Sequence, residues 1–318
     1  MRFLIILVLS VACFLNSLFA ESINDRLKQI PPEDRELLSK FFKRLCSHGD
    51  FSYTLLGQKP IGSIDYNLDL MAFPQFYKEP HKHLFLMALD EKGWEVWEKY
   101  KTLFPMQRYS LIKIREGSFF GFLLVNKKKA FEVIEDNLQV FQELVGEKIS
   151  GREILTRLCQ GKLGYYHYNI PCLVSYYKAF GLLYGYGKEN VERFAKREEI
   201  IQKLKNLPIE IKTLPLEVIR YLEVEEFSEP CKKCQQESAI DISSLNLEFL
   251  TLVDEMDLIQ TANKTNPFLP IKRSRFLGNE KSLETQAIIE NCDNLGSEIL
   301  RIYESDDFLK TVLEILTS

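Results

Sequence analysis

The sequence predicts an α+β fold that is mostly helical, with a small antiparallel sheet in the N-terminal half and an all-helical C-terminal portion. Three observations predict it. Apolar residues recur at helical spacing along most of the chain. Segments between residues 51 and 125 are rich in aromatic and β-branched residues around turn formers, which is typical of paired strands. From residue 245 onward only the helical spacing returns.

The first twenty residues predict a secretory signal peptide. Arg2 precedes the apolar run of residues 3–9, and the small residue Ala20 ends the segment. An uncleaved anchor is disfavoured because polar residues interrupt the apolar run. A lipid anchor at Cys13 is disfavoured because the residues after it stay apolar. We therefore expect an exported protein of the periplasm, envelope or secreted fraction, without a transmembrane span once the leader is removed.

The remaining chain is expected to divide into two parts. Residues 21–225 form a helix-rich α+β domain, and residues 226–318 form a helical portion that packs on it or is semi-independent. Two stretches of low hydrophobicity that contain prolines, residues 223–236 and 261–282, are the linker candidates.

The first elements expected are two helices. Residues 23–30 form the first, stopped by Pro31, and the second begins near Glu33 and ends its apolar face at Leu45, with Gly49 as a left-handed cap. The elements expected next are strands over 51–56, 61–70 and 83–89, then a helix capped by Asp90 that carries Trp94 and Trp97 and is closed by Pro105.

The strongest strand signal is a hairpin of residues 109–115 and 119–125. A long amphipathic helix ended by Gly146 follows, and residues 150–153 form a capping box for a helix through Cys159. The remaining helices are expected over residues 171–185, 191–204, 245–256 and 288–302, with a last one capped by Ser305.

Charge and motifs exclude several classes of function. The chain has 41 Lys and Arg against 45 Asp and Glu, a net charge of −4. A mildly acidic chain is not expected to have the concentrated basic surface that nucleic-acid binding needs. The glycines around Lys188 do not form a phosphate-binding loop, because Leu182 and Glu189 occupy positions where the motif needs other residues. Gly185 and Gly187 are instead expected to separate two helices. No cofactor or metal site is predicted.

Cysteine usage is the sharpest local feature. Six of the seven cysteines follow the leader, an even number that allows one to three disulfides in an oxidising compartment. Cys231 and Cys234 flank two lysines, which favours the thiolate form that a redox dithiol needs. The same pair is compatible with a structural disulfide or loop, or with half of a zinc site. Cys172 and Cys292 sit among apolar residues, where a cysteine packs as a small hydrophobe.

The histidines give weaker evidence for a functional site than the cysteines do. His81 and His83 are expected on an exposed loop edge rather than in a metal site. His167 lies between Cys159 and Cys172, so a Cys–His nucleophile pair is an open hypothesis that requires proximity in three dimensions.

Short motifs carry one resemblance. Tyr53-Thr54-Leu55-Leu56-Gly57-Gln58-Lys59-Pro60, followed by Phe104-Pro105 and by Gly185-Tyr186-Gly187, resembles an uncharacterised group of exported proteins from obligate intracellular bacteria. The resemblance covers roughly residues 35 to 200. It implies a bacterial envelope or secreted location and brings no assigned activity.

Together these observations favour an exported, non-catalytic interaction or scaffold protein. Its aromatic-rich helical surface would bind another protein or an envelope component. The alternative is a periplasmic thiol–disulfide redox protein that uses Cys231 and Cys234. A hydrolase built on His167 and a neighbouring cysteine is a third hypothesis.

Overall fold

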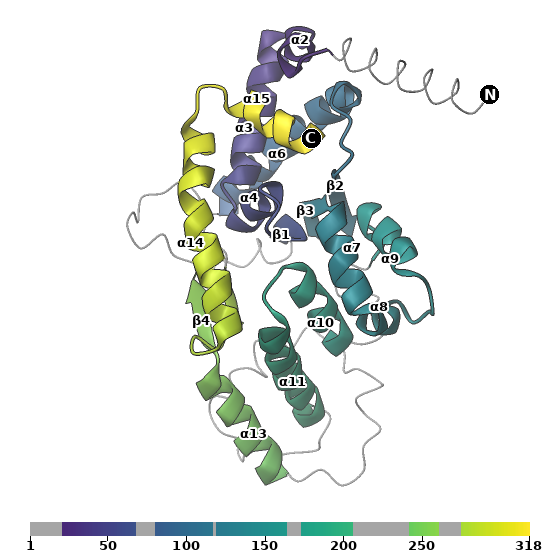
Figure 1. Cartoon of the computed structure of the whole chain (residues 1–318), viewed down its shortest axis with the longest axis vertical. Helices are drawn as coiled ribbons and strands as arrows, with labels where there is room; N and C mark the ends of the chain where they lie inside the picture. Colours follow the sequence, from purple (N-terminus) through teal and green to yellow (C-terminus); the bar gives the residue numbers. More distant parts are fainter. Residues whose placement is uncertain (1–20, 68–79, 117–118, 164–172, 206–241, 261–274) are drawn as a thin grey trace, which may run out of the picture.

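The computed structural model describes residues 21–67, 80–116, 119–163, 173–205, 242–260 and 275–318. The predicted signal peptide and most of both linker candidates lie outside these residues. Figure 1 shows helices at both ends of the molecule and a small sheet between them. The α+β class, with helices dominating and an antiparallel sheet in the N-terminal half, is confirmed.

The sheet has three antiparallel strands in the order β1-β3-β2. These are β1 (Ile61–Asn67), β2 (Tyr109–Glu116) and β3 (Phe119–Asn126). The predicted hairpin is therefore confirmed. Side chains of the central strand β3 alternate between two buried faces, since Phe122 belongs to one hydrophobic cluster and Leu123 to another. The sheet thus separates two cores.

The first core lies between the sheet and the helices α2 (Ile23–Lys28), α3 (Pro32–Cys46), α6 (Pro80–Tyr100) and α15 (Phe308–Thr317). Edge-to-face aromatic pairs fill it. Phe42 packs against Trp97 with ring centroids 5.3 Å apart, and Phe41 packs against Phe122 at 5.2 Å. Trp97 is fully buried.

Two predicted strands are helices instead. Residues 51–56 fall mostly in α4 (Gly49–Leu55), and residues 83–89 lie in α6. In α4 the buried residues Phe51 and Leu55 meet the first core at helical spacing, so tertiary packing overrides their strand preference. Gly49 accordingly begins α4 and does not cap α3.

Asp90 does not cap a helix either, because α6 begins ten residues earlier, at Pro80. Proline is favoured in the first turn of a helix, and Leu, Met and Ala in this segment are strong helix formers. His81 and His83 therefore lie in the first turn of α6 and not on a loop edge. The 3-10 turn η1 (Lys101–Leu103) follows this helix, before Pro105.

The second core lies between the other face of the sheet and the helices α7 (Lys127–Asp136), α8 (Leu138–Val145), α9 (Gly151–Cys159) and α10 (Leu173–Leu183). The single helix expected up to Gly146 is broken at Asn137, whose side-chain amide donates to the carbonyl of Val133. The left-handed Gly146 and the Ser150 side-chain cap are confirmed.

The helices α10 and α11 (Lys188–Lys205) precede the C-terminal portion of residues 226–318, which contains α13 (Ile242–Glu255), α14 (Leu283–Glu304) and α15. This portion is not entirely helical. A two-stranded sheet of β4 (Asp257–Gln260) and β5 (Arg275–Gly278) lies there, with strands too short to show a period in the sequence.

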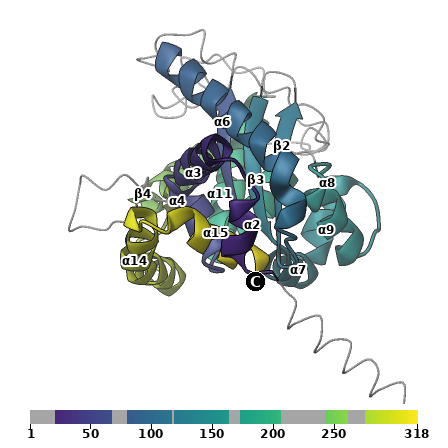
Figure 2. The same ribbon diagram turned by 90° about the horizontal axis from the view of Figure 1, so that it is seen from above.

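The C-terminal helices pack against the N-terminal ones. Leu313 and Leu316 of α15 belong to the first core, together with α2 and α3. Figure 2 shows α15 beside these helices. The predicted cap of α15 at Ser305 is wrong, because the N-cap residue is Asp307 and no side chain caps the helix. In the described parts of the chain, no helix combines the length and apolar character needed to cross a bilayer.

Candidate functional site

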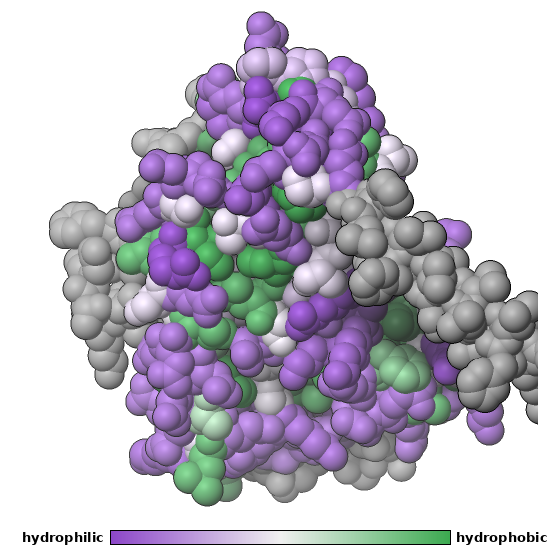
Figure 3. All heavy atoms as spheres, turned by 45° about the horizontal axis from the view of Figure 1, so that its top comes forward, coloured by the Kyte–Doolittle hydropathy of each residue, from purple (hydrophilic) through white to green (hydrophobic). Residues whose placement is uncertain are grey.

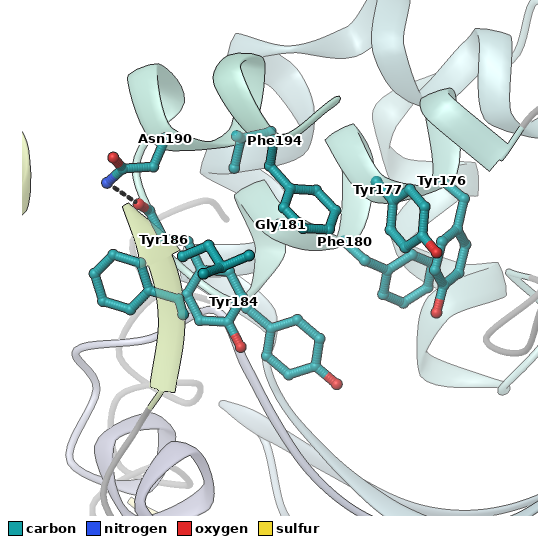
Figure 4. A pocket seen from close by; sticks show the side chains of 11 residues that line it. Tyr176, Tyr177, Phe180, Gly181, Tyr184, Tyr186, Asn190 and Phe194 are labelled. Atoms are coloured by element: carbon teal, nitrogen blue, oxygen red, sulfur yellow. Dashed lines mark hydrogen bonds between the residues drawn. The ribbon is translucent and has the colours of Figure 1, made fainter. Parts of the chain in front are cut away.

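An aromatic pocket of about 330 Å³ opens between α10, α11 and β5. Figure 4 shows its lining side chains, which come from both helices and the turn between them. The aromatic members of the lining are Tyr176, Tyr177, Phe180, Tyr184, Tyr186, Phe194 and Phe276. The pocket therefore offers ring faces and edges over most of its wall.

The sequence builds this pocket by turning one helix back on another. Steps of three and four residues along α10 place its aromatic side chains on one face. Gly185 and Gly187 have positive φ angles of 69° and 87°, and they end the helix so that α11 returns alongside α10. The expected break between two helices is confirmed. Gly181 allows the close approach, since a Cβ there would lie 2.7 Å from Val191 Cγ2.

Ring-to-ring contacts hold the walls in place. On one side Tyr186 stacks on Tyr184 at 5.5 Å and on Phe276 at 5.2 Å, with interplanar angles of 12° and 11°. On the other side Tyr177 meets Phe194 edge to face at 5.1 Å. Such aromatic pairs add stability beyond the area they bury. These contacts fix the positions of the rings that form the wall.

Asn190 is the one carboxamide among the described residues of the lining, and its polar atoms are already bonded. Its Nδ2 donates to the Tyr186 carbonyl and to Thr285 Oγ1, both at 2.9 Å, and its Oδ1 accepts from the Asn279 backbone N–H at 3.1 Å. Glu284 fixes the same junction by accepting from the backbone N–H of Lys188 at 2.7 Å. These groups tie α14 and β5 to the pocket and hold it in shape.

An ion pair between a buried lysine and a half-buried aspartate lies beside the pocket. Lys59 Nζ is 2.5 Å from Asp50 Oδ1, and the side chain of Lys59 is 5 % exposed. The same ammonium lies 5.1 Å from the centroid of Tyr186 and 5.9 Å from that of Tyr53. Burial, followed by the charges of Asp50 and Asp65, raises the pKa of Tyr186 well above its usual value. Tyr186 therefore keeps its proton.

Two of the three motifs that carry the resemblance meet at this point. Residues 53–60 supply Lys59 and Pro60, and residues 185–187 supply Tyr186. A Cβ on Gly185 would lie 3.7 Å from Pro60 Cδ. Short motifs more than a hundred residues apart thus build one junction.

Figure 3 shows hydrophobic residues gathered across the middle of one face, between hydrophilic upper and lower parts.

A second polar cluster lies in the first core, away from the pocket. Arg44 donates from Nε to Asp90 Oδ2 at 3.2 Å and from Nη2 to the Tyr66 hydroxyl at 2.7 Å, while Tyr66 donates to Asp90 Oδ2. The Asp90 side chain is 1 % exposed, and its Oδ1 accepts no hydrogen bond. Burial raises the pKa of Asp90 to about 6, although Tyr66 and Arg44 lower it. The cluster joins α3, β1 and α6.

Of the residues predicted for thiol chemistry, Cys159 alone is among those that the structure describes. Cys231 and Cys234 lie outside the described residues, and so do His167 and Cys172. The redox and Cys–His hypotheses stay predictions.

The described cysteines are separate from one another. No disulfide joins Cys46, Cys159 and Cys292 among themselves. Burial raises the pKa of the Cys46 thiol to about 12, and the predicted packing of Cys292 as a small hydrophobe is confirmed, since it is buried against apolar neighbours. Within the described ranges, no three His, Cys, Asp or Glu side chains gather as a metal site would require.

Sequence reasoning missed the aromatic pocket. The signal was present, because tyrosine and phenylalanine recur at helical spacing along α10 and a Gly-Tyr-Gly turn follows. Such a stripe indicates a buried helix face, and it does not reveal that part of the face borders a hollow. The contribution of β5 has no local signal at all.

Comparison with known proteins gives no family for this chain. A scan against protein-family models, a search among curated proteins and a search among solved structures find no match. The site is therefore interpreted from its own geometry.

Proposed function

We propose that the protein is a non-catalytic binding protein that acts outside the cytosol, and that the pocket between α10, α11 and β5 receives an apolar or aromatic group of another macromolecule. The observation that carries the proposal is the pocket itself, a hollow of about 330 Å³ with a largely aromatic lining. This volume is at the lower end of the range of roughly 300–1,000 Å³ that is usual for ligand pockets.

The lining favours binding over chemistry. General acid or base catalysis needs a group that exchanges a proton near the working pH. The described residues that line the pocket are tyrosine, phenylalanine, glycine, valine, leucine and one asparagine, and none of these types titrates near neutrality. The carboxamide of Asn190 is held by backbone and side-chain partners.

The size of the pocket favours an anchor on a larger partner. One aromatic side chain buries about 150–250 Å². At roughly 25 cal/mol per Å², burial of about 170 Å² contributes about 4 kcal/mol, which sets an upper limit on the affinity of a Kd of about 1 mM before the entropy cost of association is subtracted. A free ring would bind too weakly to act alone. A macromolecule that carries the ring adds contacts outside the pocket and reaches useful affinity.

Export is the second half of the proposal, and the leader of residues 1–20 supports it. N-terminal sequencing of the protein from its native host tests this half directly. We expect a chain that begins near Glu21 in the exported fraction. An intact Met1 on cytosolic protein would contradict export and leave the pocket proposal standing.

Peptide display tests the pocket. Leu277 lies at the pocket on β5 and is half-buried, so Leu277→Trp fills the hollow with little disturbance of the core. The matched control is Leu283→Ser, because Leu283 is 84 % exposed and does not line the pocket. We expect the wild-type protein and the control to enrich peptides that share an apolar anchor, and the filled variant to lose them. Equal enrichment by all three proteins would refute the pocket as the binding site.

An exposed apolar stripe on α6 is the rival surface. Leu84, Phe85 and Leu89 are 43 %, 63 % and 38 % exposed. Peptides that bind the wild-type protein and lose binding on Phe85→Ser, but not on Leu277→Trp, would assign recognition to α6 instead.

A further inference from the structure

Charged side chains of the protein lie next to the rings that line the pocket. Two of the rings that line it already hold a cation against a face. Arg197 Cζ lies 4.5 Å from the centroid of Phe194, and Lys59 Nζ lies 5.1 Å from that of Tyr186. The negative face of each ring is what attracts a cation, so these faces are partly used by the protein's own charges.

The carboxylates next to these cations are engaged as well. Glu198 Oε1 lies 2.6 Å from Arg197 Nη2, and Asp50 Oδ1 lies 2.5 Å from Lys59 Nζ. None of the described lining residues is acidic or basic. A guest with a net charge would lose its water without gaining a counter-charge, which is costly in a partly enclosed site.

We infer that the pocket takes a neutral aromatic ring, such as an indole or phenol side chain of a peptide, and discriminates against ammonium groups. The inference rests on the proposed function and names its ligand class. A neutral ring can meet the wall edge to face, as Tyr177 meets Tyr176, or in a tilted arrangement, as Tyr176 meets Phe180. An aliphatic group fills the same volume without these oriented contacts.

Three probes test the inference by ligand-observed NMR on the mature protein: N-acetyltryptophanamide, N-acetylleucinamide and tetramethylammonium. We expect the tryptophan derivative to bind about tenfold more tightly than tetramethylammonium and several-fold more tightly than the leucine derivative, in line with the strength of aromatic pairs. Leu277→Trp should abolish the tryptophan signal, and Leu283→Ser should preserve it.

A second variant separates charge from shape. The double substitution Lys59→Met with Asp50→Asn removes one flanking cation and its carboxylate together, so that neither member of this ion pair keeps its charge without the other. The preference for the neutral ring over tetramethylammonium should fall several-fold in this variant. An unchanged preference would overturn the role assigned to the flanking cation.

The outcomes distinguish this inference from the proposed function. Tighter binding of tetramethylammonium than of the tryptophan derivative, in a manner that Leu277→Trp abolishes, overturns the ring assignment and keeps the pocket as a binding site. Binding of all three probes that is equal in wild type and Leu277→Trp overturns both.

Discussion

Asp90 makes the stability of the fold depend on pH in an unusual direction. Most native carboxylates have a lowered pKa, so that acid destabilises a protein. The carboxyl of Asp90 is buried between α3, β1 and α6, and burial raises its pKa from 3.8 to about 6. The folded state therefore holds this proton more tightly than the unfolded state. The contribution of Asp90 to stability is largest below the unfolded pKa and is lost as the pH rises through about 6.

The perturbation that isolates this effect is Asp90→Asn, which keeps the shape of the side chain and removes its titration. The shift in pKa predicts a change in relative stability over each of two pH intervals. The stability of the wild type relative to the variant should rise by about 1.4 kcal/mol between pH 7 and pH 5, since one pKa unit corresponds to that free energy. It should rise by about 1 kcal/mol more near pH 4, where the unfolded carboxyl begins to titrate.

Urea unfolding of both proteins at each pH measures this difference. Other carboxylates, such as Asp34 with its lowered pKa, contribute equally to the two proteins and cancel. A difference that stays constant from pH 7 to pH 4, or one that shrinks as the pH falls, would refute the reasoning. The second result would mean that Arg44 and Tyr66 outweigh burial.

Three further changes test the packing. Trp97→Ala should lower the free energy of unfolding by about 3–5 kcal/mol in a urea titration, because the ring is fully buried; a loss below about 1 kcal/mol would contradict the first core as described. Gly146→Ala should lower the free energy of unfolding by roughly 1–2 kcal/mol, because the glycine is left-handed. Gly187→Ala should lower it by more, because this glycine is also left-handed and a Cβ there would lie 2.5 Å from the Glu284 side chain. Equal losses in the two variants would contradict the junction. Cys46 should react with a thiol reagent about a thousandfold more slowly than an unperturbed cysteine, because burial raises its pKa to about 12; peptide mapping after timed alkylation measures this, and a rate typical of an exposed thiol would contradict its burial.

The elements that the sequence predicted correctly have local causes. The hairpin of β2 and β3 combines alternating residues with a short turn, and Ser150 caps α9 through its own side chain. These signals lie within a few residues of each other, so they depend little on distant parts of the chain. The end of α8 at Gly146 has the same character.

The wrong predictions depend on distant contacts. Phe51 and Leu55 have the composition of a strand, but the core between α3 and the sheet accepts them as one face of a helix. Strand β5 lies in a segment that resembles a linker, and its place is set by α11 and by Asn190, nearly ninety residues earlier.

The candidate site shows the same division. The aromatic residues of α10 and the Gly-Tyr-Gly turn were visible in the sequence, and their convergence with Phe276 and Lys59 was not. Conversely, the Cys231 and Cys234 pair was visible as a motif, and its chemistry stays a prediction.

One measurement tests the central claim most directly: aromatic-selective NMR of the mature protein, titrated with a peptide selected by display. We expect shifts confined to the rings around the pocket, with Tyr176, Tyr177 and Phe194 among them, and no shift at Phe85 on α6. Shifts at Phe85 with the pocket rings unmoved would show that the partner binds elsewhere.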